Sequence, residues 1–407
     1  MSALVKERSQ SAQKTDWRVP YWPQLDGFRT LSVMMVFIIH AWICPGTKPS
    51  PIGALGYLGV DFFFTLSAFL ITSLLIREKE FFGSINYRQF VMRRGFRIWP
   101  LFYAVLFFTC VLLPFLNAPA ALPLYPQFVL QQFLPAAFFF FNFVYPFNHQ
   151  ALADFSIAIG IPVIAGVVPF WTLCVEEHFY AVWPLIMKRV PTLSALAIGI
   201  CVAELLTVLA RCVIHWIAFN AVRVEFPFQL YFMNTFCHLD PLLIGAFLAV
   251  LHHQKPKLFQ CGNRFAIPLL LLLMTAMTYL FCNLYLHFPL SNPMMIVDLT
   301  VIGFTSGLML YLTMAWSPLR KFFSAKPLAT IGRVSFAIYL FHNFILAVVE
   351  KLVAYLPLPD VQFSTFALKC LIGFPVTYVL ALLSWKYLES PCLSLKKKYG
   401  RRAVNPA

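Results

Sequence analysis

Five ionisable residues lie inside apolar segments that are long enough to cross a membrane. They are His40, Asp61, Glu176, Asp240 and His342. An ionisable side chain in hydrocarbon costs a few kcal/mol on insertion scales, so such residues usually face the interior of a helical bundle and mark a functional site. The helical rise places each one roughly 16–22 Å from the inner end of its span. The similar depths predict one polar chamber in the outer half of the membrane.

A histidine beside a carboxylate is suited to act as a general base. The carboxylate fixes the tautomer of the ring and stabilises the imidazolium that forms when the ring takes a proton. His40 is the candidate base, with Glu176 as the orienting acid and Asp61 or Asp240 as less favoured alternatives. Two structural alternatives stay open. Asp61 could hydrogen-bond a helix start, and His342 could be a packing residue among its aromatic neighbours.

Further polar residues could line the same chamber. Glu176 and Glu177 are adjacent carboxylates in an apolar helix, which makes their burial doubly costly and favours a functional role. Ser67 could act as a covalent nucleophile, but no base adjoins it in the sequence, and a membrane serine usually serves packing. The remaining candidate lining residues are Asp240, His238, His342 and Trp171.

Four arginines gather near the inner side of the predicted membrane domain. Arg93, Arg94 and Arg97 run into the third predicted span, and Arg29 lies at the inner end of the first. The guanidinium group is a planar, permanently charged fork that suits phosphate. The alternative is an anchoring role with contacts to anionic lipid. Together with an outer histidine, the arginines suit a long phosphorylated donor such as a coenzyme A thioester.

Composition defines the class of protein. The 407-residue chain is 60% apolar and 12% charged, whereas soluble domains are about a quarter charged. The net charge of +15 comes from basic residues between the apolar segments, as in the loops of inner-membrane proteins, so a nucleic-acid partner is not expected. The ten cysteines have no paired spacing and predict neither a disulfide framework nor a metal site.

The apolar segments predict an all-α, polytopic membrane bundle of about ten spans. Lys and Arg concentrate in alternate connections, as ten spans with both termini cytoplasmic would require. The segment 117–169 is rich in proline and is interpreted as external re-entrant or interfacial structure, with two further spans as the alternative. We expect cytoplasmic tails over 1–24 and 390–407 and a membrane-embedded domain over 25–389. The predicted spans are 28–44, 57–76, 98–116, 170–187, 192–214, 229–251, 266–286, 296–316, 329–350 and 364–386.

Six segments in order resemble the acyltransferase-3 family of integral membrane O-acyltransferases. The resemblance covers nearly the whole chain, and the ordered set is far more specific than any one motif. Two positions depart from the family pattern: Ala68 stands where glycine is usual, and His238 stands where an arginine typically precedes Leu239 and Asp240. The matching segments are 25–32 with His40, 59–72, 93–100, 171–180, 335–342 and 387–391.

The resemblance implies an activity and a location. His40 would be the catalytic histidine, and Arg94 with Arg97 would hold the phosphates of acyl-CoA. The family moves acyl groups, commonly acetyl, from cytoplasmic acyl-CoA to hydroxyls of extracytoplasmic glycans or similar acceptors. Acyl-CoA is then a substrate rather than a resident cofactor. A multi-pass protein of the bacterial inner membrane that modifies polysaccharide is expected.

Two other classes of function stay open from the residues alone. A proton-coupled transporter or flippase could use the His/carboxylate chamber as a relay, although no internal repeat of the kind found in many transporters is visible. A non-catalytic lipid-binding or sensory membrane protein is the other alternative. A transporter would consume no CoA thioester, and a sensory protein would tolerate replacement of His40.

Overall fold

The structure is a computed structural model. It describes residues 19–42, 56–117, 125–158, 163–217, 220, 227–260, 262–286, 295–356 and 361–395. Almost all of these residues are helical and none of them lies in a strand, which confirms the predicted all-α class. Within these ranges, eight helices are long and apolar enough to cross a membrane: Pro23–Trp42, Leu58–Phe82, Tyr87–Phe115, Leu193–Ile217, Arg264–Asn283, Ile296–Ala315, Ser335–Val353 and Gln362–Leu395.

Two of the ten predicted spans are absent from these eight. The first, 170–187, is the helix α11 (Phe170–Arg189), which has the required length but carries Glu176, Glu177 and His178 near its middle. The second, 229–251, is not one helix, so that prediction was wrong. It divides into α13 (Pro227–Phe232), the 3₁₀ turn η5 (Thr235–Cys237) and α14 (Asp240–Gln254).

Local chemistry explains the break before α14. The Asn234 side chain accepts a hydrogen bond from the Phe236 N–H at 2.9 Å, which starts a separate short turn. Pro241 then occupies the first turn of α14, where the missing N–H costs nothing. The break releases backbone carbonyls from helical pairing, and one of them becomes the partner of His238.

The segment 117–169 consists of short helices where it is described. They are α7 (Tyr125–Phe128), η3 (Val129–Phe133), α8 (Leu134–Ala137), α9 (Phe141–Ala158) and α10 (Val163–Val167). The helix α9 is kinked at Asn148, just after Pro146. None of these helices belongs to the eight membrane-length ones, which agrees with the re-entrant or interfacial interpretation. Residues 118–124 and 159–162 lie outside the described ranges.

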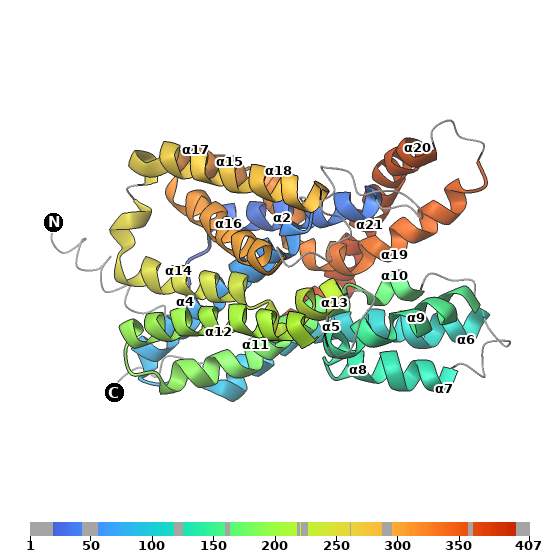
Figure 1. Cartoon of the computed structure of the whole chain (residues 1–407), viewed down its shortest axis with the longest axis horizontal. Helices are drawn as coiled ribbons and strands as arrows, with labels where there is room; N and C mark the ends of the chain where they lie inside the picture. Colours follow the sequence, from blue (N-terminus) through green and yellow to red (C-terminus); the bar gives the residue numbers. More distant parts are fainter. Residues whose placement is uncertain are drawn as a thin grey trace.

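The helix α2 (Pro23–Trp42) lies among α4 (Leu58–Phe82), α18 (Lys326–Arg333) and α19 (Ser335–Val353) (Figure 1). Glycine permits the closest of these approaches. A Cβ on Gly27 would lie 2.0 Å from the backbone carbonyl oxygen of Phe323 in α17 (Ser317–Phe323). A Cβ on Gly332 would lie 1.8 Å from the backbone carbonyl oxygen of Asp26. These backbone contacts fix the position of the N-terminal half of α2.

The helix α4 is held on two other sides. A Cβ on Gly245 of α14 would lie 2.1 Å from the Thr65 carbonyl oxygen, so α4 and α14 also cross at backbone contact. At its other end, Glu78 accepts a 2.8 Å hydrogen bond from Arg93 of α5 (Tyr87–Phe107). The Asn86 side chain caps α5 by accepting from the Gln89 N–H at 3.1 Å. These contacts fix α4 against α14 on one side and tie its C-terminal end to α5.

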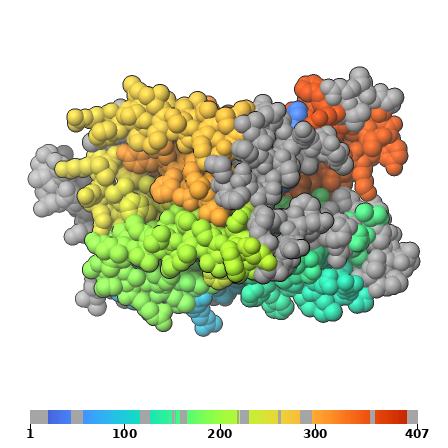
Figure 2. Space-filling model, in the orientation of Figure 1, coloured from blue at the N-terminus to red at the C-terminus, as the bar shows by residue number. Residues whose placement is uncertain are grey.

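The remaining helices pack around α2, α4 and α14 (Figure 1). On the outer face, α12 and α15 expose leucines such as Leu205 and Leu271, as expected for helices that face lipid. Figure 2 shows α12 as a continuous green band on this face. The other bounds are η1 (Phe108–Leu112), α6 (Leu113–Asn117), α12 (Leu193–Ile217), η6 (Pro256–Phe259), α15 (Gly262–Leu286), α16 (Met295–Ala315), α20 (Val361–Leu368), η7 (Lys369–Gly373), α21 (Phe374–Ser384), η8 (Trp385–Glu389) and α22 (Ser390–Leu395).

Candidate active site

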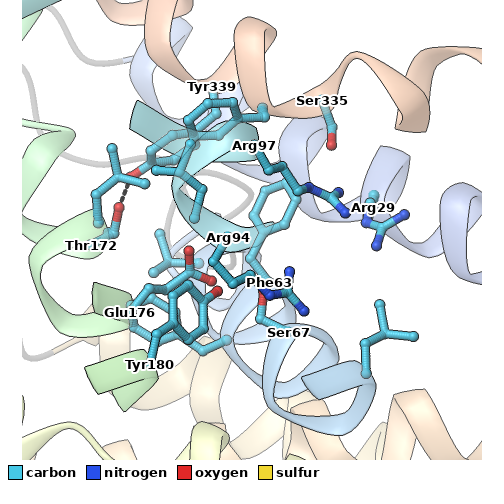
Figure 3. A pocket seen from close by; sticks show the side chains of 16 residues that line it. Arg29, Phe63, Ser67, Arg94, Arg97, Thr172, Glu176, Tyr180, Ser335 and Tyr339 are labelled. Carbon is cyan, nitrogen blue, oxygen red and sulfur yellow. Dashed lines mark hydrogen bonds between the residues drawn. The ribbon is translucent and has the colours of Figure 1, made fainter. Parts of the chain in front are cut away.

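A pocket of about 740 Å³, its open mouth included, lies between α2, α4, α5, α11 and α19 (Figure 3). Its apolar walls include Phe63, Phe64 and Phe336. Three arginines, several hydroxyl groups and the carboxyl group of Glu176 supply its polar surface. The polar lining residues are Arg29, Ser67, Arg94, Arg97, Thr172, Glu176, Tyr180, Ser335 and Tyr339.

Arg29, Arg94 and Arg97 converge on one region of the pocket (Figure 3). Arg29 forms an ion pair with Asp26 one turn earlier on α2. The Arg94 guanidinium lies over the ring of Tyr180, 5.5 Å from its centroid. Arg97 is exposed. Three guanidinium groups at one opening are chemically suited to a multiply charged anion such as a phosphate ester.

Arg93, the fourth arginine of the predicted phosphate site, has a different environment. It is buried in an ion pair with Glu78, at 2.8 Å, and is not among the residues that line the pocket. Successive residues on a helix point about 100° apart, so neighbouring arginines need not face the same way. The structure therefore assigns Arg93 to the packing of α4 against α5 and leaves three arginines at the pocket.

Glu176 lies inside the pocket beside Ser67, Tyr180 and Arg94. The adjacent Glu177 points away and accepts a 3.3 Å hydrogen bond from the Trp99 indole. Neither carboxylate contacts His40 in the part of the chain that the structure describes. The prediction that Glu176 orients His40 therefore finds no support in the contacts.

His40 instead lies against His342. The two rings meet edge to face with centroids 5.0 Å apart, and His342 Nε2 is 3.4 Å from His40 Nδ1. His40 Nδ1 also lies 2.8 Å from the Val36 carbonyl oxygen, and His342 Nδ1 lies 2.6 Å from that of Tyr339. Carbonyl oxygens only accept, so both Nδ1 atoms carry the hydrogen.

This arrangement defines the tautomer of His40. His342 Nε2 has a lone pair directed toward the Nδ1–H of His40, which stabilises a positive charge on the His40 ring. The polar contacts of His40 to other described residues all involve Nδ1. Nε2 therefore carries the lone pair that a general base needs.

Tyr339 separates the pocket from this histidine pair. It lines the pocket, and its hydroxyl lies 2.8 Å from Thr172 Oγ1 (Figure 3). The far side of its ring meets His342, with centroids 5.6 Å apart. Arg29 and His40 are eleven residues apart on α2 (40 − 29), which corresponds to roughly 16 Å along the helix axis.

The two aspartates of the predicted chamber have their own partners. Asp61 Oδ1 lies 2.7 Å from His238 Nε2, and Asp240 Oδ1 accepts a 2.6 Å hydrogen bond from Arg211. All four side chains are completely buried. Trp171 stacks on the His238 ring at 5.9 Å between centroids, so the predicted chamber residue Trp171 belongs to this cluster.

The five ionisable residues thus form three groups rather than one chamber. His40 and His342 form the first, Glu176 lies in the pocket, and Asp61 and Asp240 lie in the buried cluster.

The sequence analysis did not single out Tyr180, Thr172 and Tyr339 as pocket residues. Aromatic and hydroxyl residues are common in this chain, so these three do not stand out in the sequence. The sequence analysis also missed Glu204, Arg211 and Lys369, which are visible as further ionisable residues inside predicted spans. Among the described side chains, no three His, Cys, Asp or Glu residues gather as metal ligands would.

Comparison with known proteins assigns the chain to a class. A family model described as an acyltransferase domain matches residues 22–386, and the chain belongs to this family. The resemblance seen in the sequence is thereby confirmed. No solved structure matches the chain.

Two named relatives cover most of this chain. The O-acetyltransferase OatA of Staphylococcus aureus (strain NCTC 8325 / PS 47) is 26% identical over 382 residues, which cover 91% of this chain and 57% of the relative. The peptidoglycan O-acetyltransferase OatA of Listeria monocytogenes serovar 1/2a is 25% identical over 394 residues, which cover 91% of this chain and 56% of the relative. The chain therefore spans less than two thirds of the length of these relatives.

Proposed function

We propose that the protein is a membrane O-acetyltransferase that moves an acetyl group from cytoplasmic acyl-CoA to a hydroxyl of a glycan across a bacterial inner membrane. One observation carries the proposal. The helix α2 presents Arg29 to the pocket and, roughly 16 Å further along, His40 with its Nδ1 occupied. Membership of the acyltransferase family supports the reaction class.

The pocket is suited to the donor. Arg29, Arg94 and Arg97 would bind the phosphates of coenzyme A, because guanidinium groups pair with phosphate through two parallel hydrogen bonds. The apolar walls formed by Phe63 and Phe336 would enclose the uncharged pantetheine arm. Glu176 with Ser67 and Tyr180 would supply polar contacts partway along that arm.

His40 would act as the general base. Its Nε2 takes the proton from the acceptor hydroxyl as the oxygen attacks the thioester carbonyl. The carbon–sulfur bond then breaks, and the imidazolium returns the proton to the leaving thiolate, so the products are an O-acetyl ester and free CoA. His342 would orient the ring and stabilise its charged form, which is the role first expected of Glu176. A covalent route through Ser67 remains the lesser alternative.

The acceptor is proposed from the relatives. The name of the Listeria relative specifies peptidoglycan, so a peptidoglycan-like glycan is the first acceptor to supply. The hydroxyl would approach from the side opposite the arginines, since His40 lies near the C-terminal end of α2 and Arg29 near its start. The reaction would then take its two substrates from opposite sides of the membrane.

Binding of CoA to the purified protein tests the donor site. The Arg94→Ala/Arg97→Ala double variant should bind CoA at least about tenfold more weakly, since each charged hydrogen bond to phosphate contributes on the order of 1.5–3 kcal/mol. Arg88→Ala is the matched control, because Arg88 is an exposed arginine on the same helix and does not line the pocket. Unchanged CoA affinity in the double variant would refute the assignment.

A further inference from the structure

A second polar centre lies inside the protein, between α4, α12, α14 and α16. It contains three carboxyl groups, from Asp61, Asp240 and Glu204, and two basic groups, from Arg211 and His238. None of these residues lines the arginine pocket. The centre is therefore separate from the donor site, and its proton chemistry can be considered independently of the proposed function.

Hydrogen bonding determines the protons on His238. Its Nδ1 lies 2.5 Å from the Phe232 carbonyl oxygen, which can only accept, so Nδ1 carries a hydrogen. Its Nε2 lies 2.7 Å from Asp61 Oδ1, so one proton must lie between the ring and the carboxyl. Whichever partner holds that proton, the His238–Asp61 pair has no net charge.

Arg211 has two acids to neutralise and can balance only one. Its Nη2 donates to Asp240 Oδ1 at 2.6 Å and to Thr300 Oγ1 at 2.7 Å. The Glu204 carboxyl lies against Asp240 and close to Arg211. Asp240 Oδ2 and both carboxyl oxygens of Glu204 are buried, and no other described residue donates to them. Because two carboxylates can only accept, the contact between Glu204 and Asp240 becomes a hydrogen bond only if one of them carries a proton.

The surroundings make a second negative charge costly. Other titratable groups near Asp240 and Arg211 are the Cys237 thiol and the Asp61–His238 pair. Glu204 lies on the lipid-facing helix α12, where Leu205 and Leu206 are 69% and 57% exposed. An unbalanced carboxylate in such a place is strongly disfavoured, whereas one shared proton makes the two acids and Arg211 neutral together.

We propose that Glu204 and Asp240 form a proton-binding site within the membrane that holds one proton opposite Arg211, with Glu204 as the protonated carboxyl. A membrane-buried carboxylic acid reacts with the lipid-soluble reagent dicyclohexylcarbodiimide. The acid proton moves to a nitrogen of the reagent, and the carboxyl oxygen attacks the central carbon. The resulting O-acylurea rearranges to a stable N-acylurea, which adds the mass of one reagent molecule to the glutamate.

Peptide mapping by mass spectrometry after labelling at neutral pH tests the proposal on the full-length wild-type chain. We expect the reagent mass on Glu204 and its loss in Glu204→Gln. The exposed thiol of Cys201, one turn away on α12, is the access control and should react with a lipid-soluble maleimide in every sample. A wild-type protein whose Cys201 reacts but whose Glu204 remains unlabelled would overturn the proposal.

The decisive variant leaves Glu204 in place. In Asp240→Asn, Glu204 becomes the only acid beside Arg211, so it should ionise and lose its reactivity although it is still present. A purely structural Glu204 would react to the same extent in both proteins, and that result would also overturn the proposal. Gel filtration in detergent checks that the Asp240→Asn variant folds. If the variant does not fold, the labelling of the wild-type protein still tests the proposal.

Discussion

At the residue scale, the proposed chemistry depends on which nitrogen of His40 is left available. The Val36 carbonyl and His342 both occupy Nδ1, and this directs the basic lone pair to Nε2. A second imidazole thereby takes the place that a carboxylate usually has beside a catalytic histidine. Because a neutral imidazole stabilises an imidazolium less than a carboxylate does, His342 should assist the base rather than be essential to it.

Substitution of His342 separates this role from simple packing. His342→Gln keeps an acceptor for His40 Nδ1–H, whereas His342→Phe removes it at similar size. We expect kcat for acetyl transfer to fall roughly tenfold or more in the phenylalanine variant and less in the glutamine variant. The fall should not exceed the roughly 10²–10⁴-fold that a general base contributes in total. Equal kcat values for the two variants, measured at saturating acetyl-CoA, would contradict the role assigned to His342.

The sequence allowed most of the ionisable residues to be located but not paired. His40 and Asp61 have similar predicted depths, yet His40 meets α19 and Asp61 meets the break before α14. Which residues meet depends on how each helix is rotated about its axis, and hydropathy does not report that rotation. The division of 229–251 into α13, η5 and α14 was hidden for a different reason, since the overall apolar character of the segment resembles that of a continuous span.

At the element scale, the site depends on helices that cross at backbone contact. Gly245 lets α14 touch α4 at Thr65, two residues before Ser67, which lines the pocket. Thr65 also shares a 2.7 Å hydrogen bond with Ser306 of α16. A shift of α14 would therefore disturb both the arginine pocket and the buried cluster.

Two glycine substitutions test the importance of this crossing. Gly245→Ala should destabilise the protein by about 1–3 kcal/mol, because the new Cβ overlaps the Thr65 carbonyl. Gly199→Ala on α12 is the matched control, since a Cβ there meets nothing within 4 Å. Alanine is the better helix former, so the control should be stabilised by about 0.5–1 kcal/mol. Thermal unfolding in detergent measures both, and equal unfolding temperatures would contradict a tight crossing at Gly245.

At the scale of the whole molecule, the helices hold the proposed anion site and the proposed base at different depths of one bundle. Basic residues of the sequence concentrate in the connections on the side where α2 begins, and the three pocket arginines lie nearer that side than His40 does. This charge distribution should attract a polyanionic donor to the side that is expected to be cytoplasmic.

The ionic-strength dependence of the donor KM tests this electrostatic arrangement. For the wild-type protein we expect the KM for acetyl-CoA to rise as salt screens the arginines. The Arg94→Ala/Arg97→Ala variant should start from a higher KM and respond less to salt, whereas Arg88→Ala should respond as the wild type does. The same salt dependence in all three proteins would show that the pocket arginines do not attract the donor.

The role of His40 as the general base is tested by the rate of CoA thiol release from acetyl-CoA, measured with purified wild-type and His40→Ala protein. Both proteins are supplied with peptidoglycan-derived and other glycan acceptors. We predict a rate that is lower by about 10²–10⁴-fold in His40→Ala, with unchanged CoA affinity because His40 lies outside the pocket. Near wild-type thiol release in His40→Ala would contradict the assignment of His40 as the base.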